Sequence, residues 1–196
     1  MGKVITNLSM SLHRFIAGPE DDVGPLFRWY SSGNTDYEMP GTGMVFKVSP
    51  ASAELLREMH RTIGALVTRR RTFDITNGWG GSPPLGVPVF VVTHTVPREW
   101  VHEGSPFTFV TDGIESAVEQ ARALAEDKNV AVGAASIAQQ CIEAGLVDEI
   151  HIDLAPVLLG EGIRFFDHLG AEPIELERTR VIEAPGVTHL RFRIVK

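Results

Sequence analysis

The pattern of apolar and polar positions predicts strands that alternate with helices along most of the chain. Apolar runs with the alternation or length of strands occur at residues 4–12, 65–67, 89–93, 107–110, 130–132 and 150–159. Apolar side chains at helical spacing lie between them, at residues 50–59, 70–75, 114–126 and 134–144. We expect residues 89–93 to form a central strand, and Pro156 to kink the strand 150–159.

Two stretches depart from this alternation. Residues 20–49 are rich in Gly, Asp, Ser, Asn and Pro, and they predict a short helix within a long surface excursion that is a candidate wall or lid of a pocket. Residues 174–195 alternate as two antiparallel strands joined at Pro185-Gly186. The order predicts a three-layer α/β fold, with a mostly parallel central sheet, helices on both faces and a C-terminal antiparallel hairpin. No linker or repeat divides residues 1–196, so we expect a single domain.

The composition indicates a soluble protein that needs no nucleic acid, membrane or metal. Of the 196 residues, 43% are hydrophobic and 22% are charged, which is ordinary for a folded chain. The net charge of −7 disfavours binding to a nucleic-acid backbone. Cys141 is the single cysteine, so no internal disulfide forms, and no Cys/His spacing is typical of a zinc site. With no signal peptide and no membrane-length apolar run, a cytoplasmic location is expected.

A basic cluster follows the strand 65–67. In Thr68-Arg69-Arg70-Arg71-Thr72-Phe73 three arginines stand where a helix begins, although cations are unfavourable at a helix N-terminus. A bound polyanion would neutralise them, since guanidinium and threonine hydroxyl groups suit phosphate oxygens. A solvated basic surface is the alternative, and the sequence leaves it open.

A turn of small residues follows the strand 130–132. Val132-Gly133-Ala134-Ala135-Ser136 would let a phosphate approach backbone amides at a helix N-terminus, although close packing of the helix on the sheet explains the small residues equally well. A third turn, Gly160-Glu161-Gly162, fits either a strand exit or a pocket wall. The sequence lacks the nucleophile elbow, the P-loop and the HExxH motif, and we interpret Cys141 as a buried apolar side chain.

In this order the motifs resemble the dihydrofolate reductase superfamily. The more specific resemblance is to the C-terminal reductase domain of the bifunctional deaminase-reductase of riboflavin biosynthesis and to its stand-alone relatives. It is carried over nearly the whole chain by residues 11–18, 69–74 and 133–135, and most specifically by residues 144–151, 155–162 and 165–167.

The resemblance implies an NADPH-dependent reductase acting on a small heterocyclic substrate, and relatives of this kind often form homodimers, for which the C-terminal strands are candidates. It identifies no catalytic residue. By analogy the cofactor would be bound by Arg70, Arg71, Thr72, Thr93, His94, Val132, Gly133, Ala134, Ala135, Ser136 and Ile137. The substrate would contact Asn7, Ser9, Ser11, Ile16, Trp29 and Tyr30.

Three positions depart from the family motifs. His13-Arg14 replaces Asp-Gly, and Ala134 replaces the second glycine of a turn. Arg69 replaces the glycine before the phosphate-binding arginine, where its side chain is expected to crowd the backbone. The first change removes a carboxylate from the expected substrate side, so a nucleotide-binding protein without catalytic activity is the second hypothesis. An RNA-associated protein that uses the arginines is a third, which the acidic net charge disfavours.

Overall fold

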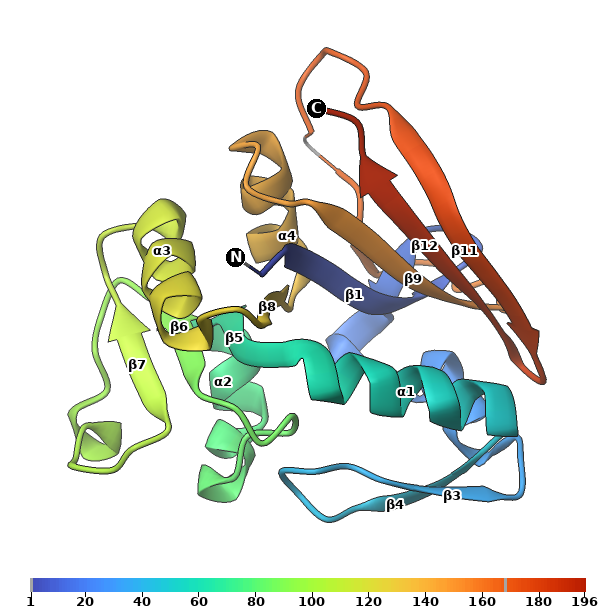
Figure 1. Cartoon of the computed structure of the whole chain (residues 1–196), viewed down its shortest axis with the longest axis horizontal. Helices are drawn as coiled ribbons and strands as arrows, with labels where there is room; N and C mark the ends of the chain where they lie inside the picture. The colour runs from blue at the N-terminus through green and yellow to red at the C-terminus, as the bar shows by residue number, and fades with distance from the viewer. Residues whose placement is uncertain (1, 168) are drawn as a thin grey trace.

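An eight-stranded sheet forms the centre of the computed structural model, which describes residues 2–167 and 169–196. Figure 1 shows the arrangement of its strands and helices. The strands stand in the order β11-β12-β9-β1-β8-β5-β6-β7. The strands from β9 to β7 run parallel, whereas β12 is antiparallel to β9 and β11 is antiparallel to β12. The bounds are β1 (Val4–Ser11), β5 (Ile63–Arg69), β6 (Val89–Val92), β7 (Phe107–Val110), β8 (Asn129–Val132), β9 (Glu149–Ala155), β11 (Leu176–Ala184) and β12 (Val187–Ile194).

Helices cover both faces of this sheet, as the sequence predicts. Helices α3 (Ile114–Ala125) and α4 (Ala135–Glu143) bury Ala117, Val118 and Ala138 against one face, in the largest apolar cluster. Helices α1 (Pro50–Thr62) and α2 (Arg70–Ile75) pack on the other face (Figure 1). Among the described residues, no helix has both the length and the apolarity needed to cross a bilayer.

The segment 20–49 contains the short helix that we expected, but it is not only a surface excursion. It begins within the 3-10 turn η1 (Pro19–Asp21) and contains the 3-10 helix η2 (Gly24–Ser31) and the hairpin of β3 (Thr35–Glu38) and β4 (Val45–Val48). Trp29, Tyr37 and Val48 are fully buried and pack against α1 in a second apolar cluster. The three apolar side chains are too widely spaced to form a periodic pattern, so the sequence did not reveal this core.

Two strand predictions were also wrong in part. Strand β6 lies next to the edge strand β7 and is not central. Strand β9 ends at Ala155, because Pro156 has no N–H to donate to a neighbouring strand. The chain beyond it returns as β10 (Ile163–Arg164) to pair with β2 (Phe15–Ala17), and a Cβ at Gly162 would lie 1.9 Å from the Ala17 carbonyl oxygen.

Candidate functional site

A cleft opens where strands β5, β6 and β7 end and helices α2, α3 and α4 begin. Its cavity has a volume of about 510 Å³, within the usual range of small-molecule sites. We name it the arginine cleft, and it is lined by Arg69, Arg70, Arg71, Val92, Thr93, His94, Thr95, Thr111, Gly113, Ile114, Ser136, Ile137 and Gln140. Ligands of open α/β sheets bind at this end of the strands, where helix N-termini converge.

The two turns that the sequence singles out meet in this cleft. Six of the eleven predicted cofactor residues line it: Arg70, Arg71, Thr93, His94, Ser136 and Ile137. The other five, Thr72, Val132, Gly133, Ala134 and Ala135, belong to the turns but are not part of its lining. Arg69 Nη1 lies 3.4 Å from Ser136 Oγ, so the end of β5 contacts the first turn of α4 directly.

Two of the three arginines are already paired with carboxylates. Arg70 Nε donates to Asp74 at 2.6 Å, and its Nη1 donates to the Thr95 carbonyl oxygen at 3.0 Å. Arg71 Nη2 donates to Asp21 at 2.5 Å, and this hydrogen bond raises the pKa of Arg71. A bound phosphate would therefore compete with Asp21 for the Arg71 guanidinium.

Other donors around the cleft have no partner among the residues that the structure describes. Arg69 Nε and Thr68 Oγ1 are buried without a hydrogen-bond partner. Gly113 and Ala134 are the N-cap residues of helices α3 and α4, and neither caps its helix with a side-chain hydrogen bond. Free amide groups at helix N-termini, together with guanidinium groups, are the donor set that phosphate oxygens require. The residues present therefore fit the phosphates of a dinucleotide.

The predicted substrate residues lie in a largely buried part of the molecule. Ser9, Ser11 and Trp29 are buried, with Trp29 only 1% exposed. The Trp29 indole donates to Ser9 Oγ at 3.3 Å, while Ser11 Oγ accepts from the Phe15 amide at 3.1 Å. The Tyr30 ring stacks on Trp29 with centroids 3.9 Å apart. Ile16 is partly buried against the main core, and Asn7 bonds inside the network described next.

Beside these residues lies a buried polar network across β1, β9 and β12, which the sequence did not reveal. Asp153 Oδ1 accepts from His189 Nδ1 at 2.7 Å and from both terminal nitrogens of Arg191 at 3.2 Å, and Asn7 donates to Asp153 Oδ2 at 3.2 Å. Burial by itself would raise the pKa of Asp153, but the His189 hydrogen bond and the Arg191 charge hold it below its ordinary value. Ser52 Oγ lies 2.9 Å from His189 Nε2.

The Asp153–His189–Ser52 arrangement has the connectivity of a hydrolase triad, but its surroundings exclude that chemistry. All three side chains are buried, and Ser52 Oγ also contacts Ser49 Oγ at 3.0 Å within the cap of α1. A nucleophile must reach its substrate. We therefore interpret the network as structural. A signal for it exists in the sequence, because His151-Ile152-Asp153 and His189-Leu190-Arg191 place polar side chains at alternate positions of paired strands.

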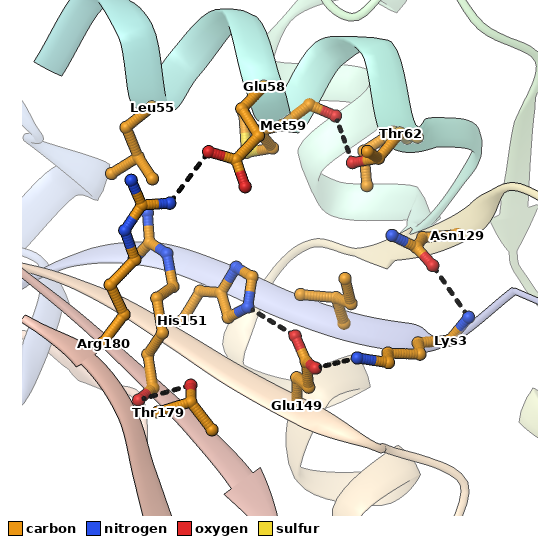
Figure 2. Close-up of a pocket in the computed structure, with 13 residues that line it drawn as sticks. Lys3, Leu55, Glu58, Met59, Thr62, Asn129, Glu149, His151, Thr179 and Arg180 are labelled. Atoms are coloured by element: carbon orange, nitrogen blue, oxygen red, sulfur yellow. Dashed lines mark hydrogen bonds and ion pairs between the residues drawn. The ribbon is translucent and has the colours of Figure 1, made fainter.

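A second cavity, of about 370 Å³, lies under α1 at the amino-terminal ends of the parallel strands (Figure 2). Its charged side chains mostly pair with one another. Glu149 accepts from His151 at 2.9 Å and from Lys3, and Arg180 donates to Glu58 at 2.8 Å. Such self-paired charges leave little cationic surplus for an anionic ligand, in contrast to the arginine cleft.

The side chains of His13 and Arg14, which replace the Asp-Gly of the family motif, do not fill the candidate site. Both side chains are exposed; His13 Nδ1 lies 2.7 Å from the Leu159 carbonyl oxygen, and the Arg14 carbonyl oxygen accepts from the Phe165 amide at 2.8 Å. These contacts hold the loop after β1 against the segment around β10. Thr111, Gly113 and Gln140 also line the cleft, and the sequence analysis missed them. A signal was present for the first two, because Gly113 lies in the turn between a predicted strand and a predicted helix.

The family described as the RibD C-terminal domain matches residues 35–189. A search among curated protein sequences finds no match. A protein from Shewanella sp. PV-4 that is assigned to riboflavin biosynthesis has a similar structure, with a TM-score of 0.75 and 19% identity over 99% of both chains.

Two further solved structures share the fold. The riboflavin biosynthesis reductase of Saccharomyces cerevisiae gives a TM-score of 0.63 at 12% identity, over 99% of this chain and 90% of that one. Dihydrofolate reductase from Enterococcus faecalis, solved with NADP(H), gives 0.56 at 16% identity, over 100% of this chain and 98% of that one. The predicted fold of the dihydrofolate reductase type is thereby confirmed.

Proposed function

The chain belongs to the family of RibD C-terminal domains, and we propose that it is a reductase that binds NADPH in the arginine cleft and reduces a small heterocyclic substrate. The observation that carries this proposal is the meeting of the arginine turn and the α4 N-terminus at one cavity. Structures of the same fold include a riboflavin biosynthesis reductase and a dihydrofolate reductase solved with NADP(H).

Each part of the cleft has a role in this proposal. Arg70, Arg71 and Thr72 bind the 2′-phosphate that distinguishes NADPH from NADH, and Thr93 and His94 flank the adenosine end. Val132, Gly133, Ala134, Ala135, Ser136 and Ile137 form the cradle of the diphosphate and the nicotinamide side. When bound, NADPH supplies the hydride that adds to a C=N or C=O carbon of the substrate. The protein orients the two molecules, and water or a substrate group supplies the proton.

A second candidate function is nucleotide binding without reduction. The specific observation in its favour is the burial of Ser9, Ser11 and Trp29, the side chains on which the substrate was expected to lie. In the proposed reductase, Trp29 and the segment around η2 shift when the substrate binds. In the binding protein they stay in place, and only the cofactor side is used.

Titration of tryptophan fluorescence with NADPH and then with NADH tests the cofactor assignment. We expect NADPH to bind more tightly than NADH. Arg71→Ala should weaken NADPH binding by about 10-fold and so remove most of this difference. Turnover is then measured with the pyrimidine precursor of riboflavin and with dihydrofolate. NADPH consumption with either substrate supports the reductase, tight NADPH binding without turnover supports the binding protein, and no binding of either dinucleotide contradicts both.

We also propose that the chain acts as a single domain in a cytoplasmic homodimer joined through its C-terminal hairpin. Strand β11 is the edge of the sheet, and Leu176 and Val181 on it are each 43% exposed. An exposed edge strand with apolar side chains favours pairing. Light scattering after size-exclusion chromatography gives the mass in solution, and Val181→Lys should shift it to that of a monomer.

A further inference from the structure

Arg69 differs from its two neighbours in lacking a bonded acidic partner among the residues that the structure describes. Arg70 donates to Asp74 and Arg71 donates to Asp21. The contact that Arg69 makes is a long one, 3.4 Å from Nη1 to Ser136 Oγ, and its Nε is buried without a partner. Burial, followed by the charge of Arg71, lowers the pKa of Arg69, as expected for a cation that is incompletely compensated.

Thr68, the preceding residue, carries a second unsatisfied group. Its side chain is 1% exposed, and Oγ1 has no hydrogen-bond partner. Successive residues of a strand point to opposite faces, so Thr68 and Arg69 flank the end of β5 on its two sides. Thr68 Oγ1 lies 3.9 Å from the position that a Cβ at Gly133 would take. The hydroxyl therefore faces the turn that leads into α4.

The first turn of α4 completes this group of donors. The helix has nine residues, begins without a side-chain cap at Ala134, and presents Ser136 to Arg69. Strands β5 and β8, which end at this point, are direct neighbours, with Val67 opposite Val132. Unsatisfied donors thus lie on both sides of one short stretch of the sheet edge.

We propose that Arg69 and Thr68 bind the diphosphate bridge of a dinucleotide where the bridge crosses the edge of the sheet at Gly133. The inference rests on the proposed function of the arginine cleft. A diphosphate carries charged oxygens on two linked groups, so it accepts from Arg69 on one side and from Thr68 on the other. Arg70 and Arg71 then bind the outer phosphate, which is the 2′-phosphate of NADPH. Arg69 is then a third phosphate ligand rather than a bulky replacement for glycine.

Calorimetric titration of the full chain with NADPH, NADH, ADP and adenosine 2′-monophosphate tests the assignment. Arg69→Ala should weaken the three diphosphate ligands by a similar factor, about 10- to 100-fold. It should leave adenosine 2′-monophosphate, which lacks the bridge, within about threefold of the wild-type value. Arg69→Lys should recover part of the loss, because it keeps the charge but not the planar fork. Arg61→Ala, at an exposed position in the last turn of α1, is the matched control.

Thr68→Val separates a binding role from a structural one. The change removes a buried hydroxyl that has no partner, so the melting temperature should rise or stay the same. Affinity for ADP and NADH should nevertheless fall, by about 3- to 10-fold. A gain in stability with no loss of affinity would show that the Thr68 hydroxyl does not contact the ligand.

The results distinguish this inference from the proposed function. If Arg69→Ala weakens NADPH and adenosine 2′-monophosphate but not NADH or ADP, Arg69 binds the outer phosphate and the inference is wrong. If the variant binds all four probes like the wild type, the inference is wrong and the cofactor assignment stands. If the wild type binds ADP through Arg69 but neither dinucleotide, the diphosphate site stands and the reductase function fails.

Discussion

The arginine cleft and the buried polar network occupy the two halves of one sheet, and they treat polar groups in opposite ways. In the cleft, at the ends of β5 to β7, Arg69 Nε and Thr68 Oγ1 have no partner in the part of the chain that the structure describes, and two helices begin without side-chain caps. In the network, across β1, β9 and β12, Asp153 accepts from three different side chains. On that side, Asn7 Oδ1 is buried without a hydrogen-bond partner among the residues that the structure describes.

Because of this difference, we expect the cleft to determine ligand binding and the network to determine the stability of the fold. Unsatisfied donors destabilise the free protein and become favourable when a ligand supplies acceptors. A buried network whose groups are mostly satisfied stabilises a single packing and offers little to a ligand. We therefore expect substitutions in the network to change the free energy of unfolding, and substitutions in the cleft to change ligand affinity.

Removal of the Asp153 carboxylate should have the largest effect on stability. Asp153→Ala leaves the buried Arg191 and His189 without their shared acceptor, and loss of one partner of a buried ion pair costs about 3–5 kcal/mol. Urea denaturation measures the loss. The control is Asp74→Ala, which breaks an exposed ion pair worth about 1 kcal/mol or less. Equal losses in the two variants would refute the distinction between the halves.

Acid should destabilise the protein through Glu149, beside the network. The hydrogen bond from His151, followed by Lys3, lowers the pKa of Glu149 from 4.5 to about 2. The unfolded chain then binds this proton more readily than the folded one, so the contribution of Glu149 to stability is complete above pH 4.5 and is lost as the pH drops towards 2. The loss is roughly 2–3 kcal/mol.

Stability measured between pH 6 and pH 2 checks this expectation, with Glu149→Gln predicted to flatten the lower part of the curve. Burial also lowers the pKa of His151, so a separate loss begins as the pH falls below 6.5. Glu177→Gln, in an exposed pair with Arg193, should keep the wild-type profile. Identical curves for Glu149→Gln and the wild type would contradict the assignment to Glu149.

Trp29→Phe should lower stability by less than Asp153→Ala and leave ligand affinity unchanged. The variant loses the indole hydrogen bond to Ser9 and leaves a small cavity, which we expect to cost about 2 kcal/mol. Affinity for NADPH should stay within about twofold, because Trp29 is not part of the cleft lining. A large loss of NADPH affinity at unchanged stability would mean that Trp29 contributes to cofactor binding.

Asp21→Asn should give the smallest change, and in the opposite direction. Asp21 holds Arg71 in a partly exposed ion pair, so its neutralisation frees the guanidinium for phosphate. We expect the dissociation constant for NADPH to fall by about two- to fivefold, as measured by calorimetry. Glu20→Gln, at the neighbouring exposed position, should leave the constant unchanged. Weaker binding in Asp21→Asn would show that Asp21 helps to bind the cofactor.

The sequence revealed those parts of the fold that depend on local patterns. Ser49-Pro50 predicts the start of α1, and Pro185-Gly186 predicts the turn between β11 and β12. The lateral position of β6 was wrong, because apolar content does not distinguish a central strand from its neighbour near the edge. The core around Trp29 and Tyr37 was missed, because it forms from residues that are close only after folding.

The sequence likewise predicted only part of the candidate site. The arginine triplet and the Gly133 turn are unusual in sequence, and the structure brings them together. The partners Asp21 and Asp74, and the burial of Ser9 and Ser11, depend on tertiary packing and leave no local pattern. Sequence patterns alone therefore indicated which groups gather at the cleft, but not which of them are already neutralised.

Ala134 has φ 79° and ψ 139°, a conformation that residues with a side chain seldom adopt. Backbone hydrogen bonds on either side hold it there, from the Gly133 amide to the Val67 carbonyl oxygen at 2.9 Å and from the Ala138 amide to the Ala134 carbonyl oxygen at 3.0 Å. The turn is thus preorganised before any ligand arrives, and association requires little conformational search. Ligands that differ in affinity at this turn should therefore differ mainly in how fast they dissociate.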